Sequence, residues 1–350
     1  SLDAAGSIRC ISDQSVNLTL RVPEDFVTIQ EAIDASIPGD QIQVSSGIYY
    51  EHLVLNGHNI TISGESAAST IIDSQDNWTV VTFNNDSSTI SGFTLTNGKS
   101  SGSNGAGINI FNDSNPIISD LIITGNTSFD SGGGIAINDC SPSIINTLIH
   151  SNHADLYGGG IYLTGNNASP TIEGCVIDNN YATLNGGGIA SYSSDFILDD
   201  TTIRNNTILP TEVYGYGGGI YLNNSSPIIT GCLIDGNSSI DDGGGLYVLG
   251  SSSAPIIQDS QFINNSSGYC GGGMYFSDNP HPKIERCIIA NNSANQHGGG
   301  IGMGTAYPDI IKTTIVCNTL YHNYNGSGIY LRNDSYMNIH SSIIQFNENS

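Results

Sequence analysis

The chain has 350 residues, and its 8 Lys and Arg against 32 Asp and Glu give a formal net charge of −24. This sign excludes nucleic acid as a partner and disfavours anionic polysaccharides unless cations bridge the two. No run of 18 apolar residues occurs, so no membrane span is predicted. The chain begins Ser-Leu-Asp without Met, and we expect that an upstream segment, such as a signal peptide, was removed from a secreted protein.

The first predicted elements precede the repeats. Residues 1–21 form an N-terminal extension that contains the alternating stretch Ser15–Leu20. This stretch predicts a strand that either covers the first coil or is donated to a neighbouring molecule. Residues 28–36 predict a short helix, because Ile29, Ala32 and Ile33 share one face, Thr28 can cap the start and Pro38-Gly39 follows the end. We expect residues 22–350 to form a single domain.

Nine glycine clusters, each followed by an apolar residue, recur at intervals of 26 to 31 residues between positions 105 and 350. Between clusters, three short runs alternate inward and outward positions and end at Gly, Pro, Asn or Ser, which is typical of strands. No stretch has the ten or more residues with a 3.6 period that a helical solenoid needs. The pattern therefore predicts nine regular coils of strands.

An asparagine ends the third run of every repeat. Asparagine tolerates the left-handed conformation of a tight turn, and stacked coils place these side chains about 4.8 Å apart, where their amides can bond to one another. We expect a structural ladder of Asn126, Asn152, Asn180, Asn206, Asn237, Asn265, Asn292, Asn318 and Asn347. Short strands with such a ladder predict an all-β fold, a parallel β-helix of about eleven coils with a capping helix.

The stretch from Val22 to Glu51 resembles the opening of the pectin-lyase-like right-handed β-helix superfamily. The resemblance rests on Thr28-Ile-Gln-Glu-Ala-Ile33, Gly39-Asp-Gln-Ile-Gln-Val44 and Gly47-Ile-Tyr-Tyr-Glu51, and it covers Val22 to Ser350. The resemblance implies that the segment Thr28–Ile33 is a short helix that caps the first coil and that the segment Gly39–Val44 is the first strand. The superfamily includes pectate and pectin lyases, polygalacturonases and pectin methylesterases.

The catalytic patterns of these enzymes are not recognisable. Of the polygalacturonase motifs only Asp-Asp occurs, at Asp199-Asp200 and Asp241-Asp242, without Gly-His-Gly or Arg-Ile-Lys. A calcium-dependent lyase needs an acidic metal site with a nearby Arg or Lys base. Arg204 instead aligns between Asp178 and Asp235 of the adjoining coils, which favours a cross-coil ion pair. No catalytic residue, metal ligand or cofactor is assigned, although calcium stays possible.

Three cysteines share one column of the repeats, separated by other residues. Cys175, Cys232 and Cys287 alternate with Thr201 and Ser260. This spacing places the thiols about 10 Å apart, beyond the reach of a disulfide. We therefore expect buried core thiols.

Two kinds of surface residue point to carbohydrate. One kind is a tyrosine that follows the glycine cluster in three consecutive coils, namely Tyr221, Tyr247 and Tyr275. If these rings are exposed, they would form a platform for stacking sugars. Alternatively, tyrosine is common on strand surfaces that bind no partner. Asn-x-Ser/Thr acceptors for N-linked glycans that lie outside the ladder are Asn17, Asn59, Asn77, Asn85, Asn112, Asn167, Asn205, Asn223, Asn224, Asn264, Asn291, Asn325 and Asn333.

The sequence stops at the ladder residue of a complete repeat without a cap. An uncapped coil exposes strand edges, and this chain could stack on itself head-to-tail, unless the sequence simply ends there. Together these features favour a secreted, glycosylated, non-enzymatic fibre or adhesin-like surface subunit. The alternative is a polysaccharide-active lyase or hydrolase of the superfamily, since the fold alone does not choose.

Overall fold

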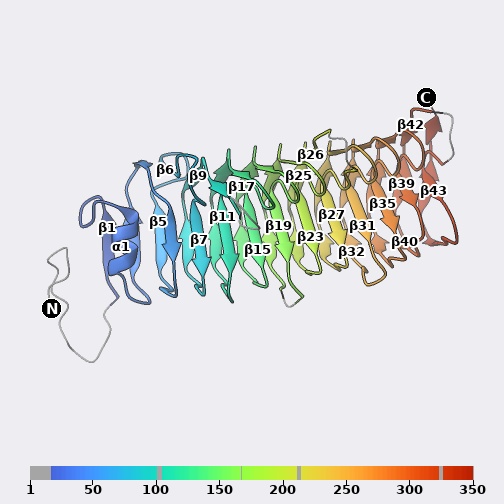
Figure 1. The fold of residues 1–350 in the computed structure, drawn as a ribbon. Helices are drawn as coiled ribbons and strands as arrows, with labels where there is room; N and C mark the ends of the chain where they lie inside the picture. The colour runs from blue at the N-terminus through green and yellow to red at the C-terminus, as the bar shows by residue number, and fades with distance from the viewer. Residues whose placement is uncertain (1–16, 101–104, 167, 211–213, 323–325, 350) are drawn as a thin grey trace.

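A computed structural model describes residues 17–100, 105–166, 168–210, 214–322 and 326–349. The chain winds into a rod of stacked coils, with the helix at one end and the last coil at the other (Figure 1). One sheet along the rod has 11 strands, and all strand pairs are parallel, as in the pairing of β11 (Ile108–Phe111) with β15 (Ile135–Asn138). The predicted right-handed parallel β-helix of about eleven coils is confirmed.

Four sheets run along the rod, and we number them in the order in which a coil visits them. Sheet I has 11 strands: β4 (Leu53–Leu55), β7 (Val81–Asn84), β11, β15, β19 (Ile161–Thr164), β23 (Ile189–Tyr192), β27 (Ile220–Asn223), β31 (Leu246–Leu249), β35 (Met274–Ser277), β39 (Ile301–Met303) and β43 (Ile329–Leu331). Sheet II has 13 strands: β1 (Thr19–Val22), β2 (Gln41–Val44), β5 (Thr61–Gly64), β8 (Thr89–Ser91), β12 (Ile117–Ser119), β16 (Ser143–Ile145), β20 (Thr171–Glu173), β24 (Ile197–Asp199), β28 (Ile228–Thr230), β32 (Ile256–Gln258), β36 (Lys283–Glu285), β40 (Asp309–Ile311) and β44 (Asn338–His340).

Sheet III has 12 strands: β3 (Gly47–Tyr49), β6 (Thr70–Asp73), β9 (Thr94–Thr96), β13 (Ile122–Thr124), β17 (Leu148–His150), β21 (Val176–Asp178), β25 (Thr202–Arg204), β29 (Leu233–Asp235), β33 (Gln261–Ile263), β37 (Ile288–Ala290), β41 (Thr314–Val316) and β45 (Ile343–Gln345). Sheet IV has 10 strands: β10 (Lys99–Ser100), β14 (Thr127–Ser128), β18 (His153–Ala154), β22 (Tyr181–Ala182), β26 (Thr207–Ile208), β30 (Ser238–Ser239), β34 (Ser266–Ser267), β38 (Ser293–Ala294), β42 (Thr319–Leu320) and β46 (Glu348–Asn349). The sequence predicted three strands per coil, and the fourth was missed because two residues are too few to show alternation.

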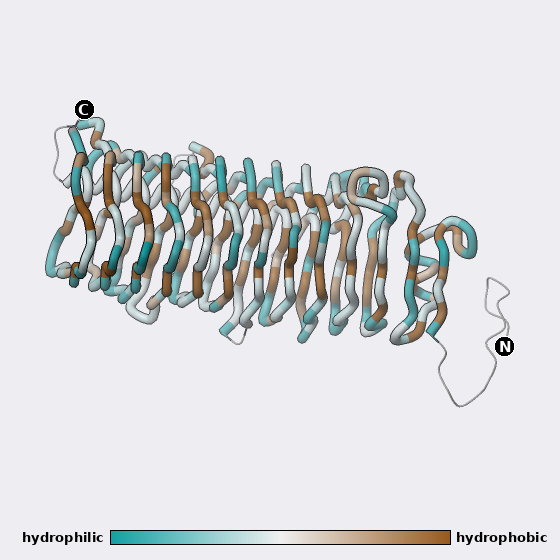
Figure 2. Tube along the Cα trace, turned by 180° about the vertical axis from the view of Figure 1, so that it is seen from behind, coloured by the Kyte–Doolittle hydropathy of each residue, from teal (hydrophilic) through white to brown (hydrophobic). Residues whose placement is uncertain are grey.

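The core is a continuous column of inward side chains. In the coil that begins at β15, the inward residues Ile135, Ile137, Ile144 and Ile149 are fully buried. Figure 2 shows hydrophobic bands recurring in successive coils along the rod. Each coil buries its apolar residues against the coils above and below, so the hydrophobic stabilisation accumulates along the rod instead of in one central core.

The N-terminal end is covered by α1 (Ile29–Ala35), which buries Ile29, Ala32 and Ile33. Thr28 caps the helix and forms a reciprocal capping box with Glu31. Next to the helix, β1 pairs with β2 of the same chain, so residues 19–22 form a strand of the first coil. This strand crosses the boundary that we predicted between residues 21 and 22.

The asparagine column forms a hydrogen-bonded ladder between sheets III and IV. The Nδ2 atom of Asn126 donates to Oδ1 of Asn152 at 2.9 Å, and the series continues to Asn318, whose Nδ2 donates to Asn347 at 2.9 Å. Each Nδ2 also donates to a backbone carbonyl, as Asn152 does to Ile123 at 2.9 Å. The amides therefore satisfy one another where no water reaches them.

The glycine clusters form the corner between sheets IV and I. Gly132 has a φ of +73°, which favours glycine. At the next position, a Cβ on Gly133 would lie 2.4 Å from the carbonyl oxygen of His153 in the coil above. A side chain at Gly133 would therefore clash with the backbone of the next coil.

The C-terminal coil differs from all the coils beneath it. Ile339 and Ile344 are 37% and 42% exposed, whereas their strand partners Ile310 and Ile315, which face inward in the preceding coil, are fully buried. The apolar edge of the last described coil is thus open to solvent, in contrast to the first coil under α1.

Candidate active site

The tyrosines predicted to form an exposed platform are buried. Tyr221, Tyr247 and Tyr275 are only 4%, 6% and 9% exposed. Their rings stack on one another, with centroids 5.5 Å apart in both successive pairs. Residues just before the glycine clusters, including Tyr216 and Cys270, fold back over this outer face of sheet I and pack on them. The prediction of an open sugar-stacking platform is therefore wrong, because other side chains of the protein occupy the space where a sugar would lie.

These side chains form a second apolar cluster outside the rod's main core. Tyr157 contacts Tyr192, with ring centroids 5.0 Å apart, and Tyr192 contacts Tyr221 at 5.3 Å. Tyr216 lies 4.7 Å from Tyr247. Burial raises the pKa of Tyr216 and of Tyr221 to about 12, so these phenols stay neutral at physiological pH.

Asp242 lies at the edge of this tyrosine cluster, immediately before a glycine cluster. Burial raises the pKa of its carboxyl group from 3.8 to about 7, and the charge of Asp241 adds to the rise. Three interactions oppose the rise: the backbone N–H of Cys270, which donates to Oδ1 at 2.9 Å, a hydrogen bond with the Cys270 side chain, and the positive charge of Arg332. The side chain keeps part of its surface accessible. Asp242 is thus a carboxyl group that can hold a proton near neutral pH and still reach a ligand.

The neighbouring groups complete a small polar site on this face. Asp241 accepts a hydrogen bond from the backbone N–H of Gly215 at 2.8 Å. The pKa of the Cys270 thiol is raised, mainly by burial and then by the charge of Asp242, so Cys270 is not a nucleophile at neutral pH. A carboxyl group that holds a proton near neutral pH can act as a general acid, and the carboxylate beside it can accept a proton.

The two Asp-Asp pairs, which look equivalent in the sequence, have different surroundings in the structure. Asp199 lies on the outer face of β24, and Asp200 is exposed in the following turn with a φ of +43°. Asp241 and Asp242 instead lie at the edge of the tyrosine cluster, where both are partly accessible. The column before the glycine clusters holds Tyr157, Asn185, Tyr216, Asp242, Cys270 and His297, and its mixed composition gave no sign that it folds over sheet I.

Arg204 lies on the outer face of sheet III, where β25 places it opposite Asp178 on one side and Asp235 on the other. Its Nη2 atom is 3.2 Å from Oδ2 of Asp178. Asp235 accepts instead from Nδ2 of Asn264 at 2.8 Å. Arg204 therefore forms the predicted cross-coil ion pair with Asp178. Asp235 lies opposite Arg204 in the strand register, but its carboxylate is bonded to Asn264 instead.

The cysteine column is a structural feature of the corner between sheets II and III. The backbone N–H of Cys175 donates to Oγ1 of Thr201 at 3.2 Å, and that of Cys232 donates to Oγ of Ser260 at 3.1 Å. Burial raises the pKa of Cys175 and of Cys287 to about 11 and that of Cys232 to about 12. All three are free thiols in the core.

The predicted glycan acceptors lie mainly in turns. Those with exposed side chains are Asn17, Asn59, Asn77, Asn85, Asn112, Asn205, Asn224, Asn264, Asn291 and Asn333. Asn223 is half-buried at the end of β27, and Asn167 and Asn325 lie outside the described residues. Accessibility permits modification at the exposed positions, and the modification itself stays a prediction.

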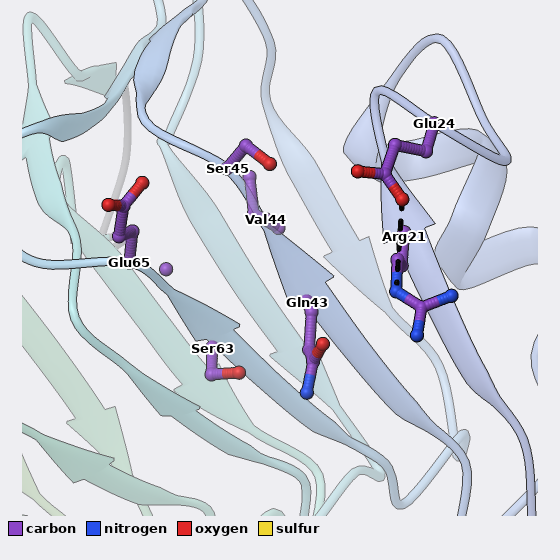
Figure 3. A pocket seen from close by; sticks show the side chains of 8 residues that line it. Arg21, Glu24, Gln43, Val44, Ser45, Ser63 and Glu65 are labelled. Atoms are coloured by element: carbon purple, nitrogen blue, oxygen red, sulfur yellow. Dashed lines mark ion pairs between the residues drawn. The ribbon is translucent and has the colours of Figure 1, made fainter.

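A groove of about 380 Å³ crosses the outer face of β1, β2 and β5. Figure 3 shows Arg21 paired with Glu24 on one side of it and Glu65 on the other, with Gln43 and Ser63 between them. The Arg21–Glu24 pair is 3.8 Å long and solvent-exposed, so it contributes little. Among the described residues, no group of three or more His, Cys, Asp or Glu side chains converges to hold a metal ion, and no helix there is long and apolar enough to span a membrane.

The described coils and sheets define a right-handed parallel β-helix. Residues 46–262 and 210–307 match the family described as right handed beta helix region, and because these segments cover more than half of the chain, the protein belongs to that family. No curated protein sequence matches the chain.

Solved structures with a similar fold include the A-module of mannuronan C-5 epimerase AlgE6 from Azotobacter vinelandii, with 16% identity, a TM-score of 0.51, and 91% of this chain and 94% of that chain covered. Pectate lyase Pel9A has 14% identity and a TM-score of 0.48, with 90% and 78% covered. The catalytic unit of a GH87 α-1,3-glucanase from Streptomyces thermodiastaticus strain HF3-3 has 14% identity and a TM-score of 0.49, with 99% and 71% covered. At these identities the likeness concerns the fold.

Proposed function

We propose that this protein hydrolyses a neutral polysaccharide at the edge of the tyrosine cluster, where Asp242 is partly accessible and acts as the general acid. The observation that carries this proposal is geometric: two adjacent, partly accessible carboxyl groups, each held by a backbone N–H, lie beside the tyrosine cluster, and burial raises the pKa of one of them, Asp242, to about 7. This is the alternative function that the sequence left open, and the enzymes with a similar fold act on polysaccharides by name. They support the proposal only as precedents for the architecture.

The proposed step uses groups that the site already holds. The carboxyl O–H of Asp242 transfers its proton to the glycosidic oxygen as the bond between that oxygen and the anomeric carbon breaks. Water adds to the anomeric carbon, and its proton passes to the carboxylate of Asp241. The products are two shorter sugar chains, and the cycle closes when Asp241 releases its proton to solvent and Asp242 takes one up.

The charge and the tyrosines favour hydrolysis of a neutral chain over elimination from an acidic one. A protein with a net charge of −24 repels a polyanion. Elimination also needs a base, and burial holds the pKa of Tyr247 and of Tyr275 well above their usual range, with the charge of Asp242 adding to the rise. Neither phenol would act as a base at neutral pH.

A structural role at the C-terminal end is a second candidate. The uncovered inward residues Ile339 and Ile344 of the last coil favour contact with another surface, such as a second copy of the chain. Because α1 covers the first coil, head-to-tail stacking would require a fit between the open coil and a helix-covered end. Secretion and N-linked glycosylation stay predictions from the sequence, and both are compatible with either candidate function.

The test is hydrolysis of purified polysaccharides, followed by the release of reducing ends. The panel contains α-1,3-glucan, β-1,3-glucan, mannan and xylan as neutral chains, and polygalacturonate and alginate as anionic ones. We expect release from a neutral chain, a loss of about a hundredfold or more in Asp242→Asn, and wild-type rates in the control Asp178→Asn. Equal rates for Asp242→Asn and wild type, unsaturated products from an anionic chain, or no release from any chain would each refute the proposal.

A further inference from the structure

A second cavity with exposed aromatic side chains lies at the N-terminal end of the rod. Its volume is about 560 Å³, and Thr28, Asp34, Tyr50, His52 and Asn56 are among its lining residues. Tyr50 and His52 belong to the loop between β3 and β4, and Trp78 follows in the next coil, between β6 and β7. The His52 and Trp78 rings are 5.7 Å apart, so Trp78 extends the rim of the cavity.

The frame of this cavity is held by hydrogen bonds. The carboxylate of Glu51 accepts from the backbone N–H groups of Ile29 and Gln30, both at 3.0 Å. The Gln30 side chain accepts from the backbone N–H of Val54 at 2.8 Å and donates to Asp34 at 2.8 Å. These bonds join α1 to β4, and the cavity is therefore set by the fold before any ligand binds.

The aromatic rings on this frame are uncovered. Trp78 is 61% exposed and Tyr50 is 62% exposed. The backbone of Trp78 is nevertheless fixed, because its N–H donates to Oγ of Ser74 at 3.2 Å and its carbonyl accepts from the N–H of Lys99 at 3.0 Å. Large rings held in place but left open, beside polar groups, are typical of a ligand site.

We propose that this cavity, which we call the N-terminal aromatic site, binds a neutral oligosaccharide. A pyranose ring would stack on Trp78 or Tyr50, and its hydroxyl groups would bond to Asp34, Asn56 and Thr28. Two carboxylates and no Lys or Arg line the cavity, so an anionic sugar is disfavoured. The volume lies within the range of about 300 to 1,000 Å³ usual for small-ligand sites.

The position of the N-terminal aromatic site connects it with the proposed hydrolysis at Asp242, and this connection rests on the proposed function. The aromatic loops flank β4 and β7 at the start of sheet I, and Asp242 precedes β31, which is seven strands beyond β4 in that sheet. At about 4.8 Å per strand the separation along the rod is roughly 34 Å. A long glycan lying along this side of the rod could contact the N-terminal aromatic site and reach Asp242 with the same chain.

The fluorescence of Trp78 tests the site directly, because the chain contains a single Trp. The protein is first treated with an endoglycosidase, since a glycan on Asn77 would cover the neighbouring ring. The probes are cellohexaose, laminarihexaose and mannohexaose, with a galacturonate hexasaccharide as the anionic probe. We expect a saturable change in emission with a neutral hexasaccharide and none with the anionic one.

Two variants and one control complete the test. Tyr50→Ala should weaken the binding at least about tenfold, while Tyr336→Ala, which removes an equally exposed ring at the other end of the rod, should leave it unchanged. Asp242→Asn should show the same change in Trp78 emission as the wild type, so binding is measured independently of hydrolysis. The inference is overturned if no neutral hexasaccharide changes the emission, if the anionic probe alone does, or if Tyr336→Ala weakens binding as much as Tyr50→Ala.

Discussion

The outer faces of sheets I and III belong to the same coils and have the same alternation of inward and outward residues. They differ in how far their outward side chains are exposed to solvent. On sheet III, Arg204 and Asp178 form an ion pair in which the arginine side chain is 48% exposed to solvent. On sheet I, the residues before the glycine clusters fold over the strands, and outward tyrosines such as Tyr247 become buried. An outward position in a β-helix is therefore exposed only where the neighbouring corner leaves it so.

This difference decides where chemistry is possible. Water screens an ion pair on an open face, and such a pair contributes little to stability or to reactivity. At the edge of the tyrosine cluster, burial costs the charged form of Asp242 part of its hydration and raises the pKa of its carboxyl group. The following predictions test this contrast, beginning with the largest expected effect.

Tyr247 should behave as a core residue although it points outward from sheet I. Replacing it with Ala removes a ring that contacts both Tyr221 and Tyr275, and we expect the free energy of unfolding to fall by about 3 to 5 kcal/mol. Leu233→Ala, at a half-exposed outward position of sheet III, should cost about 1 kcal/mol. Urea denaturation measures both, and equal losses would remove the contrast between the two faces.

Asp242 should make stability depend on pH. Its folded-state pKa is about 7 against 3.8 for an ordinary Asp, so the folded state binds the extra proton and stability falls as the pH rises from about 4 to about 7. We expect Asp242 to contribute about 2 to 4 kcal/mol to this fall. The difference between wild type and Asp242→Asn, measured by denaturation at several pH values, isolates that contribution. A flat difference would contradict the account.

Gly302 makes room for the last tyrosine of the stack. A Cβ at this position would lie 2.8 Å from Cδ2 of Tyr275, so Gly302→Ala should displace the ring and lower the free energy of unfolding by about 1 to 3 kcal/mol. Thermal denaturation measures the change. An unaltered protein would indicate that the ring moves freely and that the outer cluster is loosely packed.

Arg204→Ala on sheet III should have the smallest effect. Loss of the exposed ion pair with Asp178 should lower the free energy of unfolding by about 0.5 kcal/mol or less, and the loss should shrink further in high salt. The measurement is urea denaturation at low and high salt. A loss above about 2 kcal/mol would show that this face, too, holds energetically important polar groups.

Much of the fold follows from repetition that a single sequence displays. The recurrence of Asn126 and its equivalents predicted the ladder, and the apolar face of residues 29–33 predicted the capping helix. The folding of Tyr216 and Cys270 over sheet I could not be predicted, because the direction of a side chain at a corner depends on the coils above and below it. For the same reason the sequence could not rank Asp242 above Asp199, and it treated Tyr247 as exposed.

The most direct test of the central claim is a titration of the Asp242 carboxyl group by carbon-13 NMR in protein labelled at aspartate, with Asp242→Asn used to assign its signal. The account predicts a midpoint near pH 7, because burial at the edge of the tyrosine cluster raises the pKa of this group. A midpoint near 3.8, the ordinary value for aspartate, would contradict it and would leave sheet I without a proton donor at neutral pH.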